Sequence, residues 1–382
     1  MKVLLTGAFG NIGKYTIYEL LEKGYNVTCY DLRNKKNRKA TKTLPEEVEI
    51  IWGNLKTGEN LELAIKDQDI VIHLGFIIPP TSEENPKLAY EINVGGTKRI
   101  IEAIKAQKNP PKLVFTSTIA VYGNAQHMAP PRKVGDPLNP VDHYGRQKIE
   151  CEEIVKNSGI KWSIFRLAAA PSIDWKRVDP IMYDVPLTDR IEFVHPGDIA
   201  ISLANAVGSK GIWEKTLLIG GGKSCQIYQR EFMEKALTML GIGMLPDKAF
   251  GNKPYHTDWM DTEESERLLK YQKNTYDDFL KEQAKIFGKR AFFIKIFRPI
   301  VRWYLLCQSP YYQKYVSSKA KIKREKKSKG LGSIALATEA PAGKNNNFKK
   351  YGKTKSFRKY GKSGIIKAKN TKAIKISRKT DH

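Results

Sequence analysis

The sequence predicts an α/β fold built on a doubly wound parallel sheet. Short apolar runs alternate with stretches of helical periodicity through the first half of the chain, and the runs are short enough for buried parallel strands. Such alternation places ligands beyond the carboxyl ends of the strands. We expect strands at residues 2–5, 27–30, 48–52, 70–74, 113–117 and 163–167, and helices that include residues 61–65, 87–105 and 144–156.

A glycine-rich turn follows the first expected strand directly. It contains Gly7, Gly10 and Gly13, and a helical pattern begins near Ile12. At such a junction side chains would obstruct a phosphate, whereas the free N–H groups at a helix N-terminus favour its charge. We therefore expect a phosphate site at this turn. The alternative is a glycine turn that binds no ligand.

An acidic residue, Asp31, ends the second expected strand about 20 residues after the glycines, a position suited to a hydrogen bond with a ribose 2′-hydroxyl. A 2′-phosphate there would meet a like charge, which favours NAD over NADP. Arg33, Lys35 and Lys36 lie nearby in sequence and weaken that preference. Strand, turn, helix, strand and acid in this order predict a Rossmann-type dinucleotide-binding domain.

A tyrosine and a lysine, Tyr144 and Lys148, stand four residues apart on an expected helix, which places them on one face. A free tyrosine has a pKa near 10, too high for a good base at neutral pH, and the Lys148 ammonium would stabilise its phenolate. Thr118, just past an expected strand, can donate a hydrogen bond to the substrate oxygen that exchanges its proton with Tyr144, and so align it. We interpret Tyr144 as the acid/base, Lys148 as its electrostatic tuner and Thr118 as the positioning hydroxyl. The alternative is an ordinary helix-face pair on an inactive fold.

Together these runs resemble the extended branch of the short-chain dehydrogenase/reductase superfamily, which includes the NAD-dependent sugar-nucleotide epimerases and dehydratases. The glycines have the spacing Gly-x-x-Gly-x-x-Gly, and the resemblance is strong over residues 1–205 and weaker to about residue 285. Besides the glycine turn and the tyrosine–lysine pair, it is carried by residues 69–75, 93–97, 115–123 and 192–198.

The resemblance implies NAD as the cofactor, Thr118, Tyr144 and Lys148 as catalytic residues, and a homodimer. In the family the lysine also binds the nicotinamide ribose. Asn54 departs from the usual pattern of the family, in which an Asp follows the glycine at the position of Gly53. Its expected contact with adenine is therefore less secure. We expect no metal. The cofactor cleft would be lined by Gly7, Gly10, Asn11, Ile12, Gly13, Asp31, Asn54, Leu55, Leu74, Gly75, Asn93, Tyr144 and Lys148.

The substrate is less well defined than the cofactor. Family members that process nucleotide sugars carry an Asn-Val-Tyr-Gly-Pro-like run where residues 166–172 read Arg-Leu-Ala-Ala-Ala-Pro-Ser, so the usual polar anchor is missing. Arg177, Arg190 and residues 255–261 are candidate substrate contacts. We expect an epimerase or dehydratase acting by hydride transfer at a secondary alcohol of a nucleoside-diphosphate sugar. The alternatives are a dehydrogenase of a non-sugar hydroxyl or carbonyl substrate, and a nucleotide-sensing scaffold localised by its basic C-terminus to membrane or nucleic acid.

The chain has 382 residues, of which 41% are hydrophobic, enough for one large domain or two. Its four cysteines show no paired or ligand-type spacing, which fits a reducing cytoplasm. The first strand follows Met1 at once and leaves no room for a signal peptide, and no apolar run is long enough for a spanning helix. We predict an NAD-binding domain at 1–167, a substrate lobe at 168–285 with elements that return to the sheet, an amphipathic segment at 286–315 and a disordered basic tail at 316–382.

The net charge of +26 is concentrated in this tail, where residues 316–382 hold 21 Lys or Arg against 3 acids. Too few aliphatic side chains are present to offset the entropy of ordering. Basic residues interleaved with Tyr351, Phe357 and Tyr360 would suit nucleic-acid phosphates and bases. The alternative is a solvated charged tail.

The preceding segment, residues 286–306, is dense in aromatic and aliphatic residues and is interrupted by Lys295, Arg298 and Arg302. Basic residues three or four apart share one helical face, and Pro299 should divide the helix. This pattern is typical of an interfacial anchor on an anionic membrane, which would place the protein at the inner face of the membrane. The alternative is a helix packed on the catalytic domain or on a dimer partner.

Overall fold

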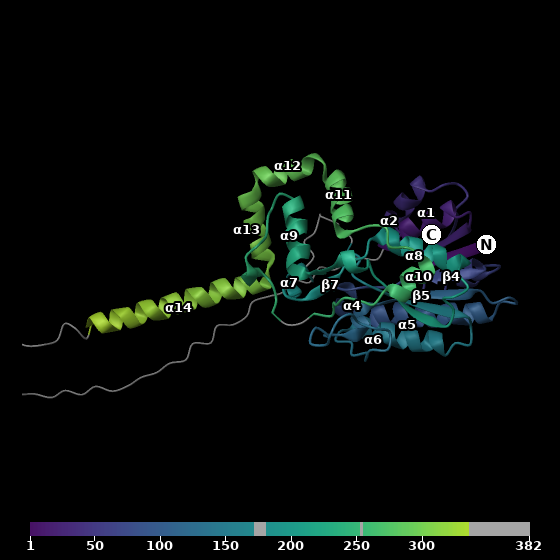
Figure 1. Cartoon of the computed structure of the whole chain (residues 1–382), viewed down its shortest axis with the longest axis horizontal. Coiled ribbons are helices and arrows are strands. Elements are labelled where there is room, and N and C mark those ends of the chain that lie inside the picture. The colour runs from purple at the N-terminus through teal and green to yellow at the C-terminus, as the bar shows by residue number, and fades with distance from the viewer. Residues whose placement is uncertain (172–180, 253–254, 336–382) are drawn as a thin grey trace, which may run out of the picture. The chain divides into compact units, whose positions relative to one another are not determined.

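The computed structural model describes residues 1–171, 181–252 and 255–335. It contains two compact units, Met1–Lys323 and Arg324–His382, and the fold below is that of the first. Its centre is a seven-stranded parallel sheet with the order β3-β2-β1-β4-β5-β6-β8 (Figure 1). The strands are β1 (Lys2–Thr6), β2 (Asn26–Asp31), β3 (Glu49–Trp52), β4 (Ile70–His73), β5 (Lys112–Thr118), β6 (Trp162–Leu167) and β8 (Lys215–Ile219). The doubly wound sheet is confirmed, and β8 is the one strand of this sheet that the sequence did not single out.

Helices cover both faces of the sheet because successive strand residues point to opposite sides. Val3 and Leu5 of β1 belong to a core shared with α1 and α8, whereas Leu4 between them belongs to a core shared with α3, α5 and α6. The helices of this half are α1 (Asn11–Glu22), α2 (Lys35–Ala40), α3 (Leu61–Ile65), α4 (Thr81–Glu84), α5 (Pro86–Lys105), α6 (His143–Lys156), α8 (Pro196–Gly208) and α10 (Glu263–Leu269).

The strand order reverses between β1 and β4, and this switch point fixes where a ligand can enter the sheet edge. Thr6 pairs with both Tyr30 and His73, so three strands end at the same level. β5 runs further, to Thr118, which pairs with Leu167 of β6. The glycine turn, Asp31 and Thr118 therefore lie along one edge of the sheet.

A second lobe is built around the antiparallel pair β7 (Arg190–Glu192) and β9 (Gln226–Tyr228). Its cores bring together Tyr183, Leu237 and Leu305 in one cluster, and Phe193, Ile227 and Phe279 in another. Its helices are α7 (Ile181–Asp184), α9 (Gln229–Met239), α11 (Tyr276–Phe287), α12 (Lys289–Ile296) and α13 (Arg298–Gln308).

His195 caps α8 by accepting the Gly197 amide through its Nδ1 atom, whereas Asp198 accepts hydrogen bonds from the Lys273 and Asn274 amides. One local prediction differs from the structure. Residues 310–335, most of which were assigned to a disordered tail, form helix α14 (Pro310–Ala335). Its Lys, Ala, Arg and Gln residues are good helix formers, which explains the difference. The remainder of the predicted tail, with Tyr351, Phe357 and Tyr360, lies outside the described residues.

Candidate active site

The glycine turn between β1 and α1 is tightly packed against the strand end of β4. Gly7 has φ +67°, and a Cβ atom there would come within 2.7 Å of the Gly75 Cα atom. A Cβ atom on Gly13 would come within 2.5 Å of the Ala8 carbonyl oxygen. Helix α1 begins after Gly10, which makes no side-chain capping bond, and its first turn holds no acid. The first backbone N–H groups of α1 are thus left for an anion, as a dinucleotide pyrophosphate requires.

Asp31 ends β2 beside this turn. Its Oδ2 atom accepts the Phe9 amide at 2.9 Å, and its Oδ1 atom accepts the Leu32 amide at 2.7 Å. Burial raises the pKa of the carboxyl group, while these bonds and the charge of Lys36 act in the opposite direction. A carboxylate has about four lone-pair sites, so two amide donors leave room for a ribose hydroxyl. The residues at this edge therefore fit a dinucleotide.

Thr118 and Tyr144 are brought together from β5 and α6. The Thr118 side chain accepts the Ala120 amide at 3.2 Å and lies near enough to the Tyr144 phenol to act on its pKa. Burial nevertheless raises the pKa of Tyr144 above its usual 10, and Thr118 only partly offsets this rise. The phenol is therefore protonated in this structure and ready to donate its proton.

Lys148 lies one turn further along α6 and is buried. Its ammonium group donates to the Thr116 carbonyl oxygen at 2.5 Å and sits 3.4 Å from the centre of the Phe76 ring. It lies 5.8 Å from the centre of the Tyr144 ring. Burial lowers the pKa of Lys148 to about 7. Sequence reasoning missed Phe76, because nothing in the spacing shows that a residue after β4 would cover the lysine.

The start of helix α6 is held from outside by Glu83 of α4. Its carboxylate accepts the His143 amide at 3.0 Å and the Tyr144 amide at 3.1 Å. Asp142 caps the same helix by accepting the Gly145 amide at 2.7 Å. Two carboxylates thus complement the positive end of the helix dipole and fix where Tyr144 emerges. Glu83 stands about 60 residues from the helix, so no local pattern could have identified it.

Asn93, expected to line the cofactor cleft, is fully buried and bonded to protein. Its side-chain oxygen accepts the Ile77 amide, and its amide group donates to the Ile77 carbonyl and to Gln147. Both of its amide hydrogens are therefore in use. Asn93 joins the segment after β4 to helix α6 and can act on a ligand only through these partners.

Asn54 and Leu55 lie at the turn after β3. The Asn54 side-chain oxygen accepts the Lys56 amide at 2.9 Å, which leaves it one lone pair for an adenine contact. Leu55 packs so closely on the β4 end that a Cβ atom on Gly75 would come within 2.7 Å of its side chain. Leu74, also expected at the cleft, donates its amide to the Thr6 carbonyl oxygen and is half-buried.

His73, at the end of β4, has a structural environment. Its two ring nitrogens lie 2.7 Å from the Thr6 hydroxyl and 3.1 Å from the Thr97 hydroxyl. Burial lowers the pKa of His73 to about 3, so the ring stays neutral. It joins β1, β4 and α5 beneath the glycine turn.

Arg190, a candidate substrate contact, is occupied inside the lobe. Its guanidinium forms two hydrogen bonds with Asp258, at 2.6 and 3.0 Å, and also donates to the carbonyls of Gln126 and Met128. Asp258 is itself buried and pairs with Arg132 as well. This network ties the lobe to the loop after β5. Arg177, the other arginine considered, lies outside the described residues.

Residues 3–170 match the model of the NAD dependent epimerase/dehydratase family. This part of the chain is similar to that family. The UDP-glucose 4-epimerase of Pisum sativum is 31% identical over 167 residues, which cover 41% of this chain and 47% of the relative. That of Lactobacillus helveticus is 30% identical over 173 residues, 44% of this chain and 51% of the relative. The chain thus spans about half the length of these curated relatives.

Solved structures of epimerases share the fold of this chain over most of their length. The UDP-glucuronic acid 4-epimerase of Bacillus cereus, in complex with UDP-glucuronic acid and NAD, has a TM-score of 0.63 at 21% identity and covers 75% of this chain and 98% of its own. The UDP-glucose 4-epimerase of Bifidobacterium longum, in complex with NAD⁺ and UDP, has a TM-score of 0.60 at 20% identity, with coverages of 73% and 96%. The shared fold therefore extends beyond residue 170.

Proposed function

We propose that this chain is an NAD-dependent enzyme of the epimerase or dehydratase type that acts at a secondary alcohol of a nucleoside-diphosphate sugar. The observation that carries the proposal is the meeting of Thr118, Tyr144 and Lys148 at the sheet edge that also holds the glycine turn and Asp31. Support for a sugar nucleotide comes from the relatives, which are UDP-sugar epimerases. A dehydrogenase of another alcohol is the alternative that uses the same residues.

The residues at the turn define how the cofactor would be held. The N-terminal amides of α1, with Asn11, Ile12 and Gly13, would bind the pyrophosphate, and the Asp31 carboxylate would accept from a ribose hydroxyl. Asn54 and Leu55 would face the adenine end, and Lys148 the nicotinamide ribose. When bound, NAD supplies the acceptor for the hydride that leaves the alcohol carbon.

Residues of this chain would transfer the proton of the substrate hydroxyl. Once Tyr144 has lost its own proton, a substrate hydroxyl placed between Thr118 and Tyr144 would receive a hydrogen bond from the threonine and give its proton to the Tyr144 phenolate. The Lys148 ammonium would lower the cost of the phenolate, because opposite charges a few ångströms apart favour the ionised forms. With a pKa of about 7, Lys148 is able to gain or lose a proton near neutrality. In the reverse direction Tyr144 returns the proton to the substrate oxygen.

Quantifying the nucleotide released from purified full-length protein, then screening sugar nucleotides, tests this proposal. We expect NAD in the released fraction and a new sugar nucleotide, epimerised or dehydrated, without accumulation of NADH. Steady NADH formation would favour the dehydrogenase alternative. Bound NAD without turnover of any sugar nucleotide or alcohol would favour the scaffold, and a protein that binds no NAD would overturn the proposal. Sedimentation of the same sample would test the homodimer, which stays a prediction.

A further inference from the structure

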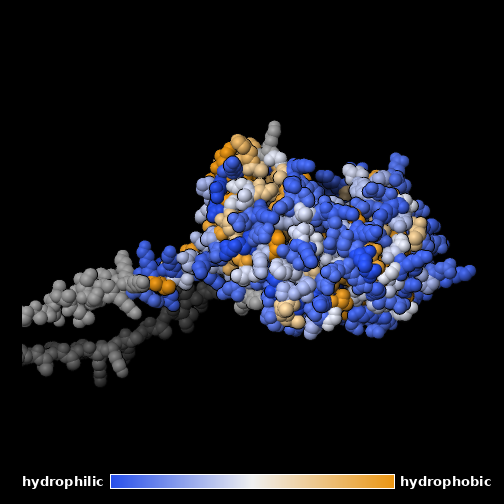
Figure 2. Space-filling view, in the orientation of Figure 1, coloured by the Kyte–Doolittle hydropathy of each residue, from blue (hydrophilic) through white to orange (hydrophobic). Residues whose placement is uncertain are grey.

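Helices α12 and α13 each have one face on the protein and one face in solvent. Ala291, Ile294, Val301 and Leu305 pack on the core of the second lobe. The opposite face carries large apolar side chains that are between 50 and 66% exposed, and Figure 2 shows hydrophobic residues gathered over this end of the lobe. We call these residues the apolar ridge: Phe292, Phe293, Ile296, Phe297, Ile300, Trp303 and Tyr304.

The ridge is comparable in size with the largest apolar patch of a typical monomeric protein, which is often a functional surface. Its members recur three or four residues apart within each helix and therefore share a face. Since aromatic side chains bury about 150–250 Å² each, seven half-exposed side chains present on the order of several hundred Å² of apolar surface. A patch of this size on two helices is typical of a surface that has a partner.

The charges around the ridge select that partner. From residue 286 to residue 324 the chain contains ten Lys or Arg and no Asp or Glu. Arg290 and Lys295 are exposed on α12, and Lys319, Lys321 and Lys323 are exposed on α14. Among the ion pairs of the described residues, none uses these five side chains. An apolar face on a stretch of chain this rich in cations fits an anionic lipid surface, whereas a second copy would bring like charges together.

Two arginines predicted to meet the membrane are instead used inside the lobe. Arg298 donates to the Ile242 carbonyl at 2.9 Å, and Arg302 donates to the carbonyls of Ile242, Gly243 and Met244 at 2.7–3.0 Å. These bonds satisfy carbonyl groups just after α9 and hold α13 in place. The cationic contribution at the ridge therefore falls to Arg290, Lys295 and α14.

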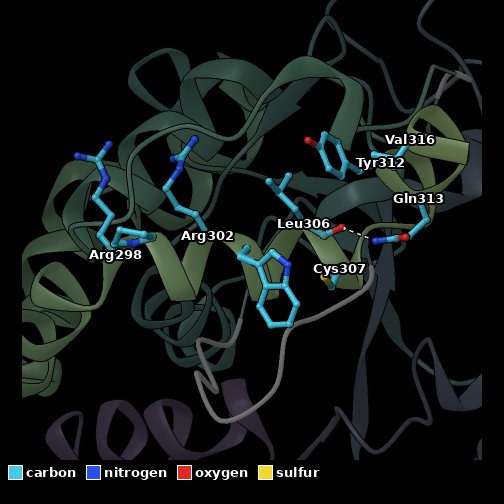
Figure 3. A pocket seen from close by; sticks show the side chains of 9 residues that line it. Arg298, Arg302, Leu306, Cys307, Tyr312, Gln313 and Val316 are labelled. Atoms are coloured by element: carbon cyan, nitrogen blue, oxygen red, sulfur yellow. Dashed lines mark hydrogen bonds between the residues drawn. The ribbon is translucent and has the colours of Figure 1, made fainter. Parts of the chain in front are cut away.

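A groove continues the ridge between α13 and α14. It has a volume of about 670 Å³, and its lining includes Trp303, Leu306 and Val316 (Figure 3). The Gln313 side chain, which donates to the Leu306 carbonyl at 3.3 Å, joins the two helices across it. Its mainly apolar lining gives an acyl chain a place beside the exposed indole.

We propose that the apolar ridge docks this protein on the surface of an anionic lipid bilayer. The aromatic side chains enter the boundary between headgroups and acyl chains, and the flanking lysines and arginine contact lipid phosphates. No helix among the described residues is long and apolar enough to cross a membrane, so the association is peripheral. The proposal is independent of the reaction, because the ridge lies on the second lobe and the catalytic trio on the sheet edge.

Flotation of the full-length protein with phosphatidylcholine vesicles, with and without phosphatidylglycerol, tests the proposal. We expect binding that requires phosphatidylglycerol. The combined substitution Ile296→Ser, Ile300→Ser and Trp303→Ser should lower the partition coefficient at least about tenfold, since each side chain loses its apolar transfer free energy. Leu63 and Leu88 are exposed apolar residues on α3 and α5 and provide the matched control. Leu63→Ser with Leu88→Ser should float like the parent.

Several outcomes would overturn the proposal. Flotation that the ridge substitutions leave unchanged and that high salt abolishes would assign binding to the basic C-terminus alone. The same result, together with a gel shift of RNA by the parent protein, would favour nucleic acid. If the ridge substitutions convert a dimer into a monomer without changing flotation, the ridge is a self-association face. Near-UV circular dichroism of each variant shows that the lobe is still folded, so that lost flotation reports on the ridge.

Discussion

The two halves of this molecule carry different kinds of information. In the sheet half, the glycine turn, Asp31 and the tyrosine–lysine pair lie in one family's order, and residues 3–170 match that family's model. In the second lobe, partly buried arginines such as Arg190 hold the lobe together instead of facing a ligand. The proposed chemistry thus rests on the half that the family model matches, whereas the proposed docking surface lies in the lobe beyond it.

This difference follows from how each half is built. A parallel sheet forces its ligands to the carboxyl ends of the strands, so similar chemistry recurs at the same edge. The lobe has no such rule, because its helices pack through side chains such as Phe279 and Leu237, which many sequences can supply. This difference between the two halves can be tested with variants that change turnover, cofactor binding or stability separately.

Tyr144→Phe should strongly lower turnover without loss of the cofactor. Removing the hydroxyl deletes the group that exchanges the proton, so we expect kcat to fall by about 10²–10⁴-fold. The content of bound NAD should stay nearly unchanged, because the ring and its packing on Phe76 are kept. Turnover by stopped assay with nucleotide quantification measures both. Tyr90→Phe, at an exposed tyrosine on α5, is the control; a Tyr144→Phe enzyme that keeps its kcat would refute the assigned role.

Asp31→Asn should weaken NAD binding by about 10-fold to 100-fold, because a hydrogen bond to a charged group is worth about 1.5–3 kcal/mol. Loss of the negative charge should also narrow the preference for NAD over NADP, since Lys36 would then face a 2′-phosphate unopposed. Calorimetric titration with both cofactors measures the change. Asp69→Asn, whose carboxylate accepts the Lys2 amide at the opposite end of β1, should leave both affinities unchanged. An equal loss for both cofactors would speak against the ribose contact.

Much of this site could be predicted from sequence because it is local. Gly7, Asp31 and Thr118 stand at strand ends that hydrophobic periodicity identifies, and Tyr144 and Lys148 are one helical turn apart. What the sequence could not show are contacts made through space.

Contacts between distant segments account for the residues that were missed or placed differently. Phe76 covers Lys148, Glu83 holds the start of α6, and Asn93 bonds to Gln147 instead of opening to the cleft. In the lobe, the backbone after α9 turns Arg298 and Arg302 inward, because exposed carbonyls there need donors. Hydrophobic periodicity predicts on which face of a helix or strand a residue lies. Which other residues it contacts is determined only by the packing of the folded chain.

Glu83→Gln should have a smaller effect, a fall in kcat of roughly 2-fold to 5-fold with KM nearly unchanged. The amide keeps one acceptor for the His143 and Tyr144 amides but loses the charge that favours the helix N-terminus, worth about 0.3–1 kcal/mol. Steady-state kinetics measures kcat and KM separately. A selective fall in kcat would not be expected from a general loss of stability. The neighbouring Glu84→Gln serves as the control. If Glu83→Gln changed the thermal midpoint but not kcat, its role would be structural only.

Lys148→Met tests how far the catalytic half gives up stability for function. Burial lowers the pKa of Lys148 from 10.5 to about 7, so the unfolded chain holds this proton more tightly than the folded chain. Below pH 7 the folded protein bears the full free-energy cost of burying the charged lysine. That cost falls as the pH rises from 7 to 10.5, where the unfolded lysine loses its charge as well. We expect Lys148→Met to abolish turnover yet raise the thermal midpoint by about 2–8 °C at pH 6.5, as a gain of 1–2 kcal/mol would.

The gain should shrink when the same scans are run near pH 10, where the unfolded lysine also approaches neutrality. The exposed Lys98→Met, on α5, should show no such pH dependence and is the matched control. A Lys148→Met protein that is less stable than the parent at every pH would mean that the bond to Thr116 and the contact with Phe76 outweigh burial of the charge. In that case the lysine would stabilise the sheet edge as well as serve the reaction, and the catalytic half would be no more strained than the lobe.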